Sequence, residues 1–193
     1  IVSHAYATIA IATIWIVVYF SHPDHLEEKE FAMTRYHPFL VALHWLLALM
    51  IIGGLIMGGS VLAETANDDP FKLTSLRMHM GMGLAILVLM VVRLITRLRT
   101  SKPAHADIGN AALNKVGAWT HWAFYLIVIA MCLSGIAIAR MAGLPDIVFG
   151  GSGAPLPADF SIYPPRAAHG ILALVLKLLI AGHIAAFLYH QFV

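Results

Sequence analysis

Histidine is the residue type in this sequence whose number and placement point to chemistry. Eleven histidines occur among the 193 residues, and five of them lie well inside long apolar blocks. An ionisable side chain inside a membrane is costly and usually functional, although a hydrogen bond between helices would equally explain a single neutral imidazole. The pattern across the whole set favours metal ligands.

Two of these histidines share one face of the last apolar block. His169 and His183 are 14 residues apart, which on an α-helix places them within about 40° of each other and about 21 Å apart along the axis. One helix therefore presents an imidazole near each surface of a membrane. Other blocks supply a partner at each depth, His79 at the outer level and His44 at the inner level.

Two imidazoles at each level predict two haem irons whose axial positions are both filled. Such a centre leaves no site for dioxygen, so it transfers electrons, and burial and hydrogen bonds to its ligands tune its potential. The chain has one cysteine, Cys132, and no Cys-x-x-Cys-His motif, which indicates haem b held without covalent bonds. Zinc fits less well, because neither level offers three or four converging ligands.

Two charged side chains inside the blocks are candidates for contacts with haem propionates or quinone. Arg93 follows His79 by 14 residues, so it lies near the same helix face at the inner level. There it either pairs with a propionate or anchors the helix at the membrane surface. Lys177 lies near mid-membrane, about 80° around the helix from His169. Its role is open between snorkelling, a quinone contact and the lining of a polar gap.

Two further histidines compete for the inner ligand positions. His190 lies seven residues beyond His183 and shares its face, and His121 lies at the inner end of the fourth block. We prefer His183 to His190 because its depth matches that of His44. Either His121 or His190 could instead contact quinone in an inner pocket.

The apolar blocks that carry these side chains predict an all-α membrane protein. Hydrophobic residues make up 60% of the chain and charged residues 11%, whereas a soluble domain is about a quarter charged. Blocks of about twenty apolar residues match the thickness of a bilayer. They must be helical, because lipid offers no partner to an unpaired backbone group. The predicted spans are residues 1–20, 38–59, 76–98, 117–142 and 166–193.

The spans divide into two predicted parts. Residues 31–193 are expected to form a four-helix bundle that binds both haems, with a surface loop rich in Gly and Pro over 143–165. Residues 1–30 are expected to add an N-terminal transmembrane helix and a polar linker. The first span lacks the basic start and cleavage site of a signal peptide. An interfacial helix or the remainder of a preceding domain are the alternatives, since the sequence begins with Ile rather than Met.

Positive charges predict the orientation of the bundle, because short loops rich in Lys and Arg remain in the cytoplasm. Seven basic residues lie at the end predicted to be cytoplasmic: Lys29, Arg35, Arg93, Arg97, Arg99, Lys102 and Lys115. Four lie at the other end: Lys72, Arg77, Arg140 and Arg166. The net charge of +2, without a basic stretch interleaved with aromatic residues, gives no indication of nucleic-acid binding.

Motifs along the chain resemble those of the bacterial cytochrome b561 family. The stretches that carry the resemblance are Arg35-Tyr36-His37-Pro38, Leu43-His44-Trp45, His79-Met80-Gly81, Thr120-His121-Trp122, Leu133-Ser134-Gly135, His169-Gly170 and Gly182-His183-Ile184. The resemblance covers about residues 35–193, and the ligand spacing on several helices makes it specific. The extra N-terminal span departs from the usual form of the family and suggests docking to a protein partner or a fused element.

The resemblance implies a four-helix core with two b haems in the bacterial inner membrane, with ligands at His44, His79, His169 and His183. Members of the family include superoxide oxidases, which pass electrons from periplasmic superoxide to ubiquinone. Others are the b subunits that link nickel hydrogenases to the quinone pool. We therefore expect transmembrane electron transfer between an outer donor and membrane quinone, which would make the chain an oxidoreductase.

Alternatives stay open for both the donor and the class of function. If superoxide is the donor, the four outer basic residues should attract the anion, although four carboxylates weaken that field: Asp68, Asp69, Asp146 and Asp159. A second interpretation is a haem-b membrane subunit of a larger respiratory or redox complex. A third, from another class, is a non-redox anchor or transporter with the histidines in a proton relay, which predicts no haem.

Overall fold

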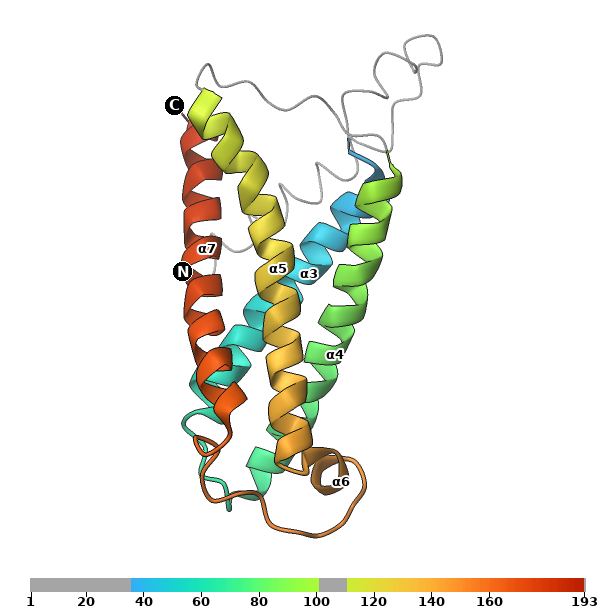
Figure 1. Ribbon diagram of the computed structural model, residues 1–193, viewed down its shortest axis with the longest axis vertical. Helices are drawn as coiled ribbons and strands as arrows, with labels where there is room; N and C mark the ends of the chain where they lie inside the picture. The colour runs from blue at the N-terminus through green and yellow to red at the C-terminus, as the bar shows by residue number, and fades with distance from the viewer. Residues whose placement is uncertain (1–35, 101–110, 193) are drawn as a thin grey trace, which may run out of the picture. The chain divides into compact units, whose positions relative to one another are not determined.

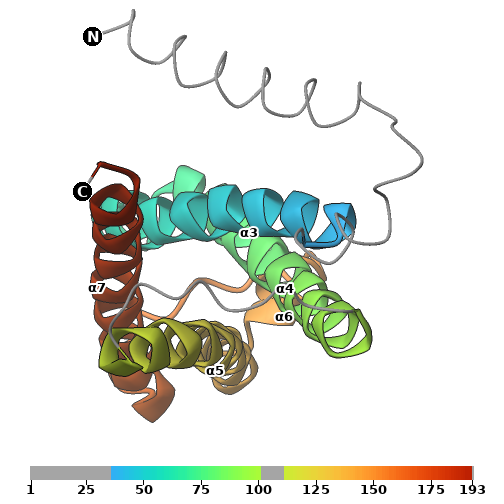
Figure 2. The same ribbon diagram turned by 90° about the horizontal axis from the view of Figure 1, so that it is seen from above.

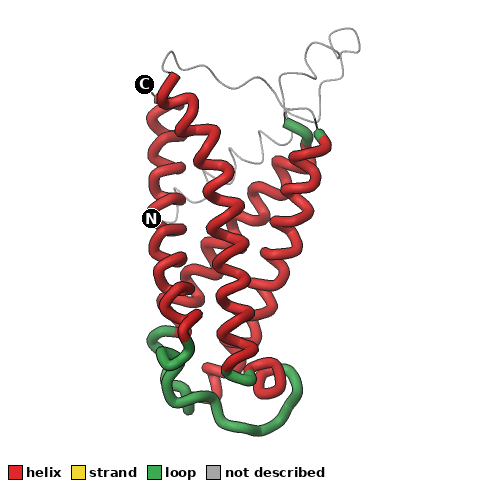
Figure 3. The backbone as a smooth tube through the Cα atoms, in the orientation of Figure 1, coloured by secondary structure: helices red, strands yellow, loops and turns green. Residues whose placement is uncertain are grey.

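The computed structural model describes residues 36–100 and 111–192, and for residues 111–113 and 190 it describes the backbone alone. Within these ranges the chain consists of helices and loops, with no strand (Figure 3). The elements are α3 (Pro38–Ile56), the π-helix η1 (Met57–Leu62), α4 (Pro70–Arg99), α5 (Ala111–Met141), α6 (Leu144–Val148) and α7 (Pro164–Phe192). The predicted N-terminal helix and linker, residues 1–30, lie outside the described residues.

Four helices in the described ranges are long and apolar enough to cross a membrane. They are Pro38–Leu62, Pro70–Arg99, Asn114–Met141 and Pro164–Tyr189. Large apolar side chains on their outer faces are widely exposed, among them Leu49 at 71% and Leu126 at 72%. A soluble domain rarely exposes so large an apolar surface, whereas lipid accepts it. The prediction of an all-α, multi-pass membrane protein is confirmed.

Proline marks the start of three of these helices. Pro38, Pro70 and Pro164 each occupy a first-turn position, where the missing N–H has no helical partner to lose. Before α4, the Asp69 carboxylate accepts a hydrogen bond from the N–H of Phe71 at 2.8 Å, which is a typical N-cap. This cap explains why α4 begins at Pro70 and not at the predicted residue 76.

The four long helices surround a common interior. Seen from above, α4 lies between α3 and α5, and α7 lies at the side of α5 away from α4 (Figure 2). The central core of buried side chains combines all four helices: Leu47, Ile86, Met90, Tyr125, Val128 and Leu176. A second core at the α6 end gathers residues of α4, α5 and α6. The packing therefore holds the helices as one bundle (Figure 1).

Two short elements were not predicted from the sequence. The end of α3 continues into the π-turn η1, which contains Gly58 and Gly59; π-turns of this kind are frequent at functional sites. Gly143 ends α5 with a left-handed backbone at φ 65°, as glycine does at many helix ends. The short helix α6 follows inside the predicted loop, because its apolar side chains Leu144 and Val148 are buried in the second core.

Candidate functional site

Two histidines from different helices face each other near the α6 end of the bundle. His79 lies in the third turn of α4, and His169 lies in the second turn of α7. Their ring centroids are 6.2 Å apart, and their ring planes meet at 75°. Both side chains are half-buried. We call them the His79–His169 pair.

A second group of histidines lies toward the opposite end of the bundle. His44 of α3 and His183 of α7 have ring centroids 6.3 Å apart and planes at 70°, and we call them the His44–His183 pair. His121 of α5 is also close, with its centroid 6.2 Å from that of His183. Phe124 packs edge-on against the His183 ring at 5.4 Å. His183 therefore has two histidine neighbours at nearly equal distances.

The ring separations are those that one metal ion needs between two opposed imidazoles. A metal–imidazole bond is about 2.0–2.1 Å long and the ring centre lies about 1.1 Å behind the bonded nitrogen, so two rings on opposite sides of one ion are about 6.2–6.4 Å apart. Rings in simple edge contact span a wider range of about 4.5–7 Å. The separations in both pairs are compatible with a bis-imidazole metal centre, and so is the 6.2 Å between His121 and His183.

Glycines allow two helix backbones to approach the rings of the His79–His169 pair. A Cβ atom at Gly58 would lie 3.3 Å from Cε1 of His79, and a Cβ atom at Gly135 would lie 3.3 Å from Cε1 of His169. Both distances are shorter than an ordinary van der Waals contact, so the absence of a side chain is what makes room for the rings. The pair thus sits in a cradle that larger residues would fill.

The two rings of this pair differ in their hydrogen bonds. Nδ1 of His169 lies 2.9 Å from the hydroxyl oxygen of Ser134 on α5. Nδ1 of His79 is enclosed and has no hydrogen-bond partner among the described residues. A buried polar atom without a partner is uncommon in a native protein, so the two rings of the pair have different surroundings.

The two pairs are connected by one helix and separated by apolar side chains. α7 supplies His169 to one pair and His183 to the other, 14 residues along the same helix. The central core, with Tyr125, Val128 and Leu176 among its members, fills the bundle at mid-height. Two metal centres held by these pairs would therefore lie in a dry interior at two depths of the membrane.

The comparison with known proteins decides the family. A model of the family described as prokaryotic cytochrome b561 matches residues 35–193. The chain belongs to the prokaryotic cytochrome b561 family. The resemblance predicted from the motifs is therefore confirmed, and the chain is a bacterial multi-pass membrane cytochrome of b type that transfers electrons.

Two relatives of this cytochrome carry informative names. It is 29% identical over 164 residues to the probable superoxide oxidase CybB of Yersinia pestis, an alignment that covers 82% of this chain and 90% of the relative. It is 25% identical over 116 residues to cytochrome b561 homolog 2 of Escherichia coli (strain K12), with 60% of this chain and 61% of the relative covered.

The other polar residues singled out from the sequence fall in different surroundings in this cytochrome. Arg93 donates a hydrogen bond to the carbonyl of Leu40, so part of its guanidinium links α4 to α3 on the helix turn before His44. Lys177 is exposed halfway along α7. His190 lies in the last turn of α7, and its side chain is outside the described part of the structure.

Two of the four outer basic residues donate hydrogen bonds to backbone carbonyls. Lys72 is almost fully buried, and its ammonium donates to the carbonyls of Leu62 and Thr65. Arg77 donates twice to the carbonyl of Val148, at 3.0 and 2.6 Å. These contacts close the connection between η1 and α4 and tie α6 to α4. Arg140 and Arg166 are exposed, as is Arg77.

Arg97 and Tyr125 have features that sequence reasoning did not identify. The Arg97 guanidinium lies over the rings of Trp122 and Tyr125, at 5.8 and 5.9 Å from their centroids. Nε of Arg97 and the hydroxyl of Tyr125 are enclosed and lack a hydrogen-bond partner within the ranges that the structure covers. The sequence marked Arg97 only as a membrane-surface cation, and nothing in the pattern distinguished Tyr125 from a packing residue.

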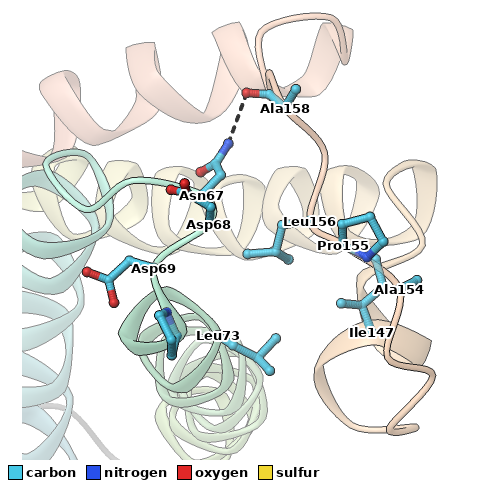
Figure 4. Close-up of a pocket in the computed structure, with 10 residues that line it drawn as sticks. Asn67, Asp68, Asp69, Leu73, Ile147, Ala154, Pro155, Leu156 and Ala158 are labelled. Carbon is cyan, nitrogen blue, oxygen red and sulfur yellow. Dashed lines mark hydrogen bonds between the residues drawn. The ribbon is translucent and has the colours of Figure 1, made fainter.

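A pocket of about 690 Å³ opens at the α6 end, between the connection before α4 and the loop before α7 (Figure 4). Apolar side chains form part of its wall, including Leu73, Ile147 and Leu156. Asp68 and Asp69 contribute the carboxylates. The Asn67 amide donates to the carbonyls of Pro157 and Ala158, at 2.8 and 3.1 Å, and so joins the two segments. The pocket is therefore acidic, and it disfavours anions.

Proposed function

We propose that this cytochrome carries electrons across the bacterial inner membrane through two b haems, one between His79 and His169 and the other between His44 and His183. The observation that carries the proposal is the separation of the rings, 6.2 Å in one pair and 6.3 Å in the other. Both values fall within the span of about 6.2–6.4 Å for two imidazoles on one metal ion, and we take His44 and not the equally near His121 as the partner of His183. When bound, a haem with two imidazole ligands accepts and donates one electron without opening its iron to dioxygen.

The protein residues would do three things in this function. The four histidines hold the cofactors at two depths, and α7 fixes the distance between them because it contributes to both pairs. The central apolar core excludes water from the space between the pairs. Gly58 lets η1 lie against the His79 ring, and Gly135 lets α5 lie against the His169 ring.

We propose that electrons enter at the His79–His169 end, which the distribution of basic residues predicts to be periplasmic. Superoxide is the donor class suggested by the printed name of the Yersinia pestis relative. Each superoxide that gives up one electron becomes dioxygen. Arg166 is exposed and lies three residues before His169 on α7, so it is positioned to attract the anion to this pair.

At the other end, we propose that a membrane quinone takes two electrons and two protons to become a quinol. His121 is the described side chain best suited to this step, because its Nδ1 donates to the carbonyl of Gly117 at 3.0 Å. A neutral imidazole has one N–H, so Nε2 of His121 is left with a free lone pair. That nitrogen can first take a proton from water on the cytoplasmic side and then pass it to a quinone oxygen near the His44–His183 pair. Arg93 and Lys177 stay further candidates for contacts with quinone or a propionate, as does His190.

The direct test is rapid-mixing reduction of the purified oxidised protein by superoxide, followed at the haem absorbance and compared with reduction by quinol. We expect superoxide to reduce the wild-type protein faster at low than at high salt, because exposed charges are screened by salt. Arg166→Gln should lower the rate severalfold and flatten its salt dependence, while Arg140→Gln, which removes an exposed charge on α5, should change it less. Reduction by quinol alone would contradict superoxide as the donor.

A further inference from the structure

We propose that Ser134 is a positioning residue that fixes which nitrogen of His169 faces iron and thereby lowers the potential of that haem. The inference rests on the proposed function, because it requires a haem between His79 and His169. It concerns a side chain that touches neither haem nor substrate in the proposal and acts through the ligand.

The hydrogen bonds of Ser134 determine where its proton lies. Its hydroxyl oxygen is 2.7 Å from the carbonyl oxygen of Met131, three residues earlier in α5, and 2.9 Å from Nδ1 of His169 in α7. A carbonyl oxygen can only accept, so the single hydroxyl proton of Ser134 points to Met131. The hydroxyl oxygen must then accept the second bond, and Nδ1 of His169 must donate it. The Met131 carbonyl also interacts with the His169 ring and, as an acceptor, favours the same tautomer.

This arrangement selects one tautomer of His169. A neutral imidazole carries one N–H, so a proton on Nδ1 leaves the lone pair on Nε2. The opposite tautomer would direct the hydroxyl proton to Nδ1 and leave two oxygen atoms 2.7 Å apart with no hydrogen between them. Only the first arrangement satisfies both contacts. Nε2 is therefore the nitrogen presented to a metal.

Packing adds to the effect of the hydrogen bond. Gly135, the next residue of α5, lies against the same ring, and a Cβ atom there would approach Cε1 of His169 to 3.3 Å and Nδ1 to 3.6 Å. A ring turned over by 180° would place a carbon atom against the Ser134 oxygen and lose the bond. Ser134 and Gly135 together hold His169 in one position and one orientation.

His79, the other ring of the pair, has no hydrogen bond like the one that Ser134 makes with His169. Nδ1 of His79 is enclosed without a hydrogen-bond partner among residues 36–100 and 111–192, although Gly58 packs against its ring in the same way. The pair is therefore asymmetric. The Ser134 bond makes His169 the more basic ligand, because a hydrogen bond from the remote N–H raises the basicity of the metal-binding nitrogen. A more basic ligand favours ferric over ferrous iron, so the bond lowers the midpoint potential.

The test is a potentiometric titration of the purified holoprotein, with haem absorbance as the readout. In Ser134→Ala we expect one of the two midpoint potentials to rise and the other to stay. If the bond favours the ferric state about tenfold, the shift is about 59 mV for this one-electron couple. Ser134→Thr should return the potential toward the wild-type value, because a helical threonine can bond the carbonyl three residues back and keep its oxygen available.

Cys132→Ala is the matched control, because Cys132 lies two residues away on α5 and is also half-buried. It should leave both potentials unchanged. Two bound haems with unmoved potentials in Ser134→Ala would overturn this inference and leave the proposed function standing. Equal shifts in the Ala and Thr variants would also overturn it, because Thr keeps the hydroxyl that Ala lacks and the shift would then not depend on that hydroxyl. A wild-type protein without haem would instead overturn the proposed function.

Discussion

His183 of α7 has two histidine neighbours, and these differ in the hydrogen bonds of their rings. His121 is tied by Nδ1 to the carbonyl of Gly117 in its own helix. No hydrogen bond to the ring of His44 is found among the described residues, and His44 is exposed on the bundle side of α3 that faces His183. The bond of His121 presents Nε2 in the same way as the bond of His169 does, so the hydrogen bonds do not choose between His44 and His121 as the ligand. We propose His44 as the ligand and His121 as the residue that handles protons because the depth of His44 in the sequence matches that of His183.

Alanine variants at these two positions separate the roles. We expect His44→Ala to lose the haem of the His44–His183 pair, which lowers the haem content from two to one per chain. His121→Ala should keep both haems and slow electron exchange with quinone by about 10²-fold, a typical loss for an acid–base group. The measurements are haem content and the rate of haem oxidation by quinone. If His121→Ala loses the haem and His44→Ala keeps it, the ligand assignment is reversed.

Tyr125 offers a stability test of a buried hydroxyl. Its side chain is 5% exposed, and its oxygen has no partner within the described chain; such a group costs about 1–3 kcal/mol. We therefore expect Tyr125→Phe to raise the thermal midpoint of protein freed of quinone, by about 2–4 °C for each kcal/mol gained. Tyr163→Phe, in the loop region before α7, serves as the control. A lower midpoint for Tyr125→Phe would mean that the hydroxyl has a partner in the holoprotein.

Among the elements, the π-turn η1 leads to a prediction that would not apply to a regular helix. Gly58 of η1 packs against the His79 ring, whereas a Cβ atom at the adjacent Gly59 would meet nothing within 4 Å. Gly58→Ala should therefore displace the ring by a few tenths of an ångström and weaken haem binding about tenfold, comparable to the loss of a ligand-orienting contact. Gly59→Ala is the matched control and should bind haem like the wild type. Equal behaviour of the two variants would contradict the close approach.

The sequence predicted most of the long elements because lipid demands long apolar helices. It placed the start of the third span at residue 76, whereas α4 begins at Pro70 and its Lys72 is buried against the carbonyls of Leu62 and Thr65. The π-turn η1 and the short helix α6 were missed because they depend on tertiary packing, namely the approach of Gly58 to His79 and the burial of Val148.

At the site, periodicity indicated His169 and His183 as residues of one helix face, and depth suggested their neighbours. The structure brings His79 near His169 and both His44 and His121 near His183. Ser134 could not be found in the same way. It lies 35 residues from His169 in the chain, and a serine in an apolar helix usually bonds its own backbone. The contact between Ser134 and His169 becomes apparent only from the packing of α5 on α7.

For the molecule as a whole, the balance of basic side chains sets the orientation in the membrane. At the α6 end, Lys72 and Arg77 are bonded to neutral carbonyls and keep their charges, so the four basic residues that the sequence placed there remain. The other end carries Arg97, Arg99 and Lys115 near the ends of α4 and α5. The positive-inside rule then predicts that the α6 end lies in the periplasm.

Reporter fusions check this orientation. Alkaline phosphatase, which is active only outside the cytoplasm, should be active when fused within the loop before α7, at about residue 152. It should be inactive when fused directly after Arg99. The control is expression of both fusions, measured by immunoblot of the membrane fraction. Activity in the second fusion and not in the first would invert the topology and would move the proposed donor site to the cytoplasmic side.

The central claim is that four imidazoles hold two haems, and the ratio of haem to protein tests it most directly. We expect two b haems per chain in the purified wild type, with an α-band on reduction, and one per chain in His169→Ala, because α7 loses its ligand at one depth only. A wild-type protein without haem, or a ratio that His169→Ala leaves unchanged, would contradict the account.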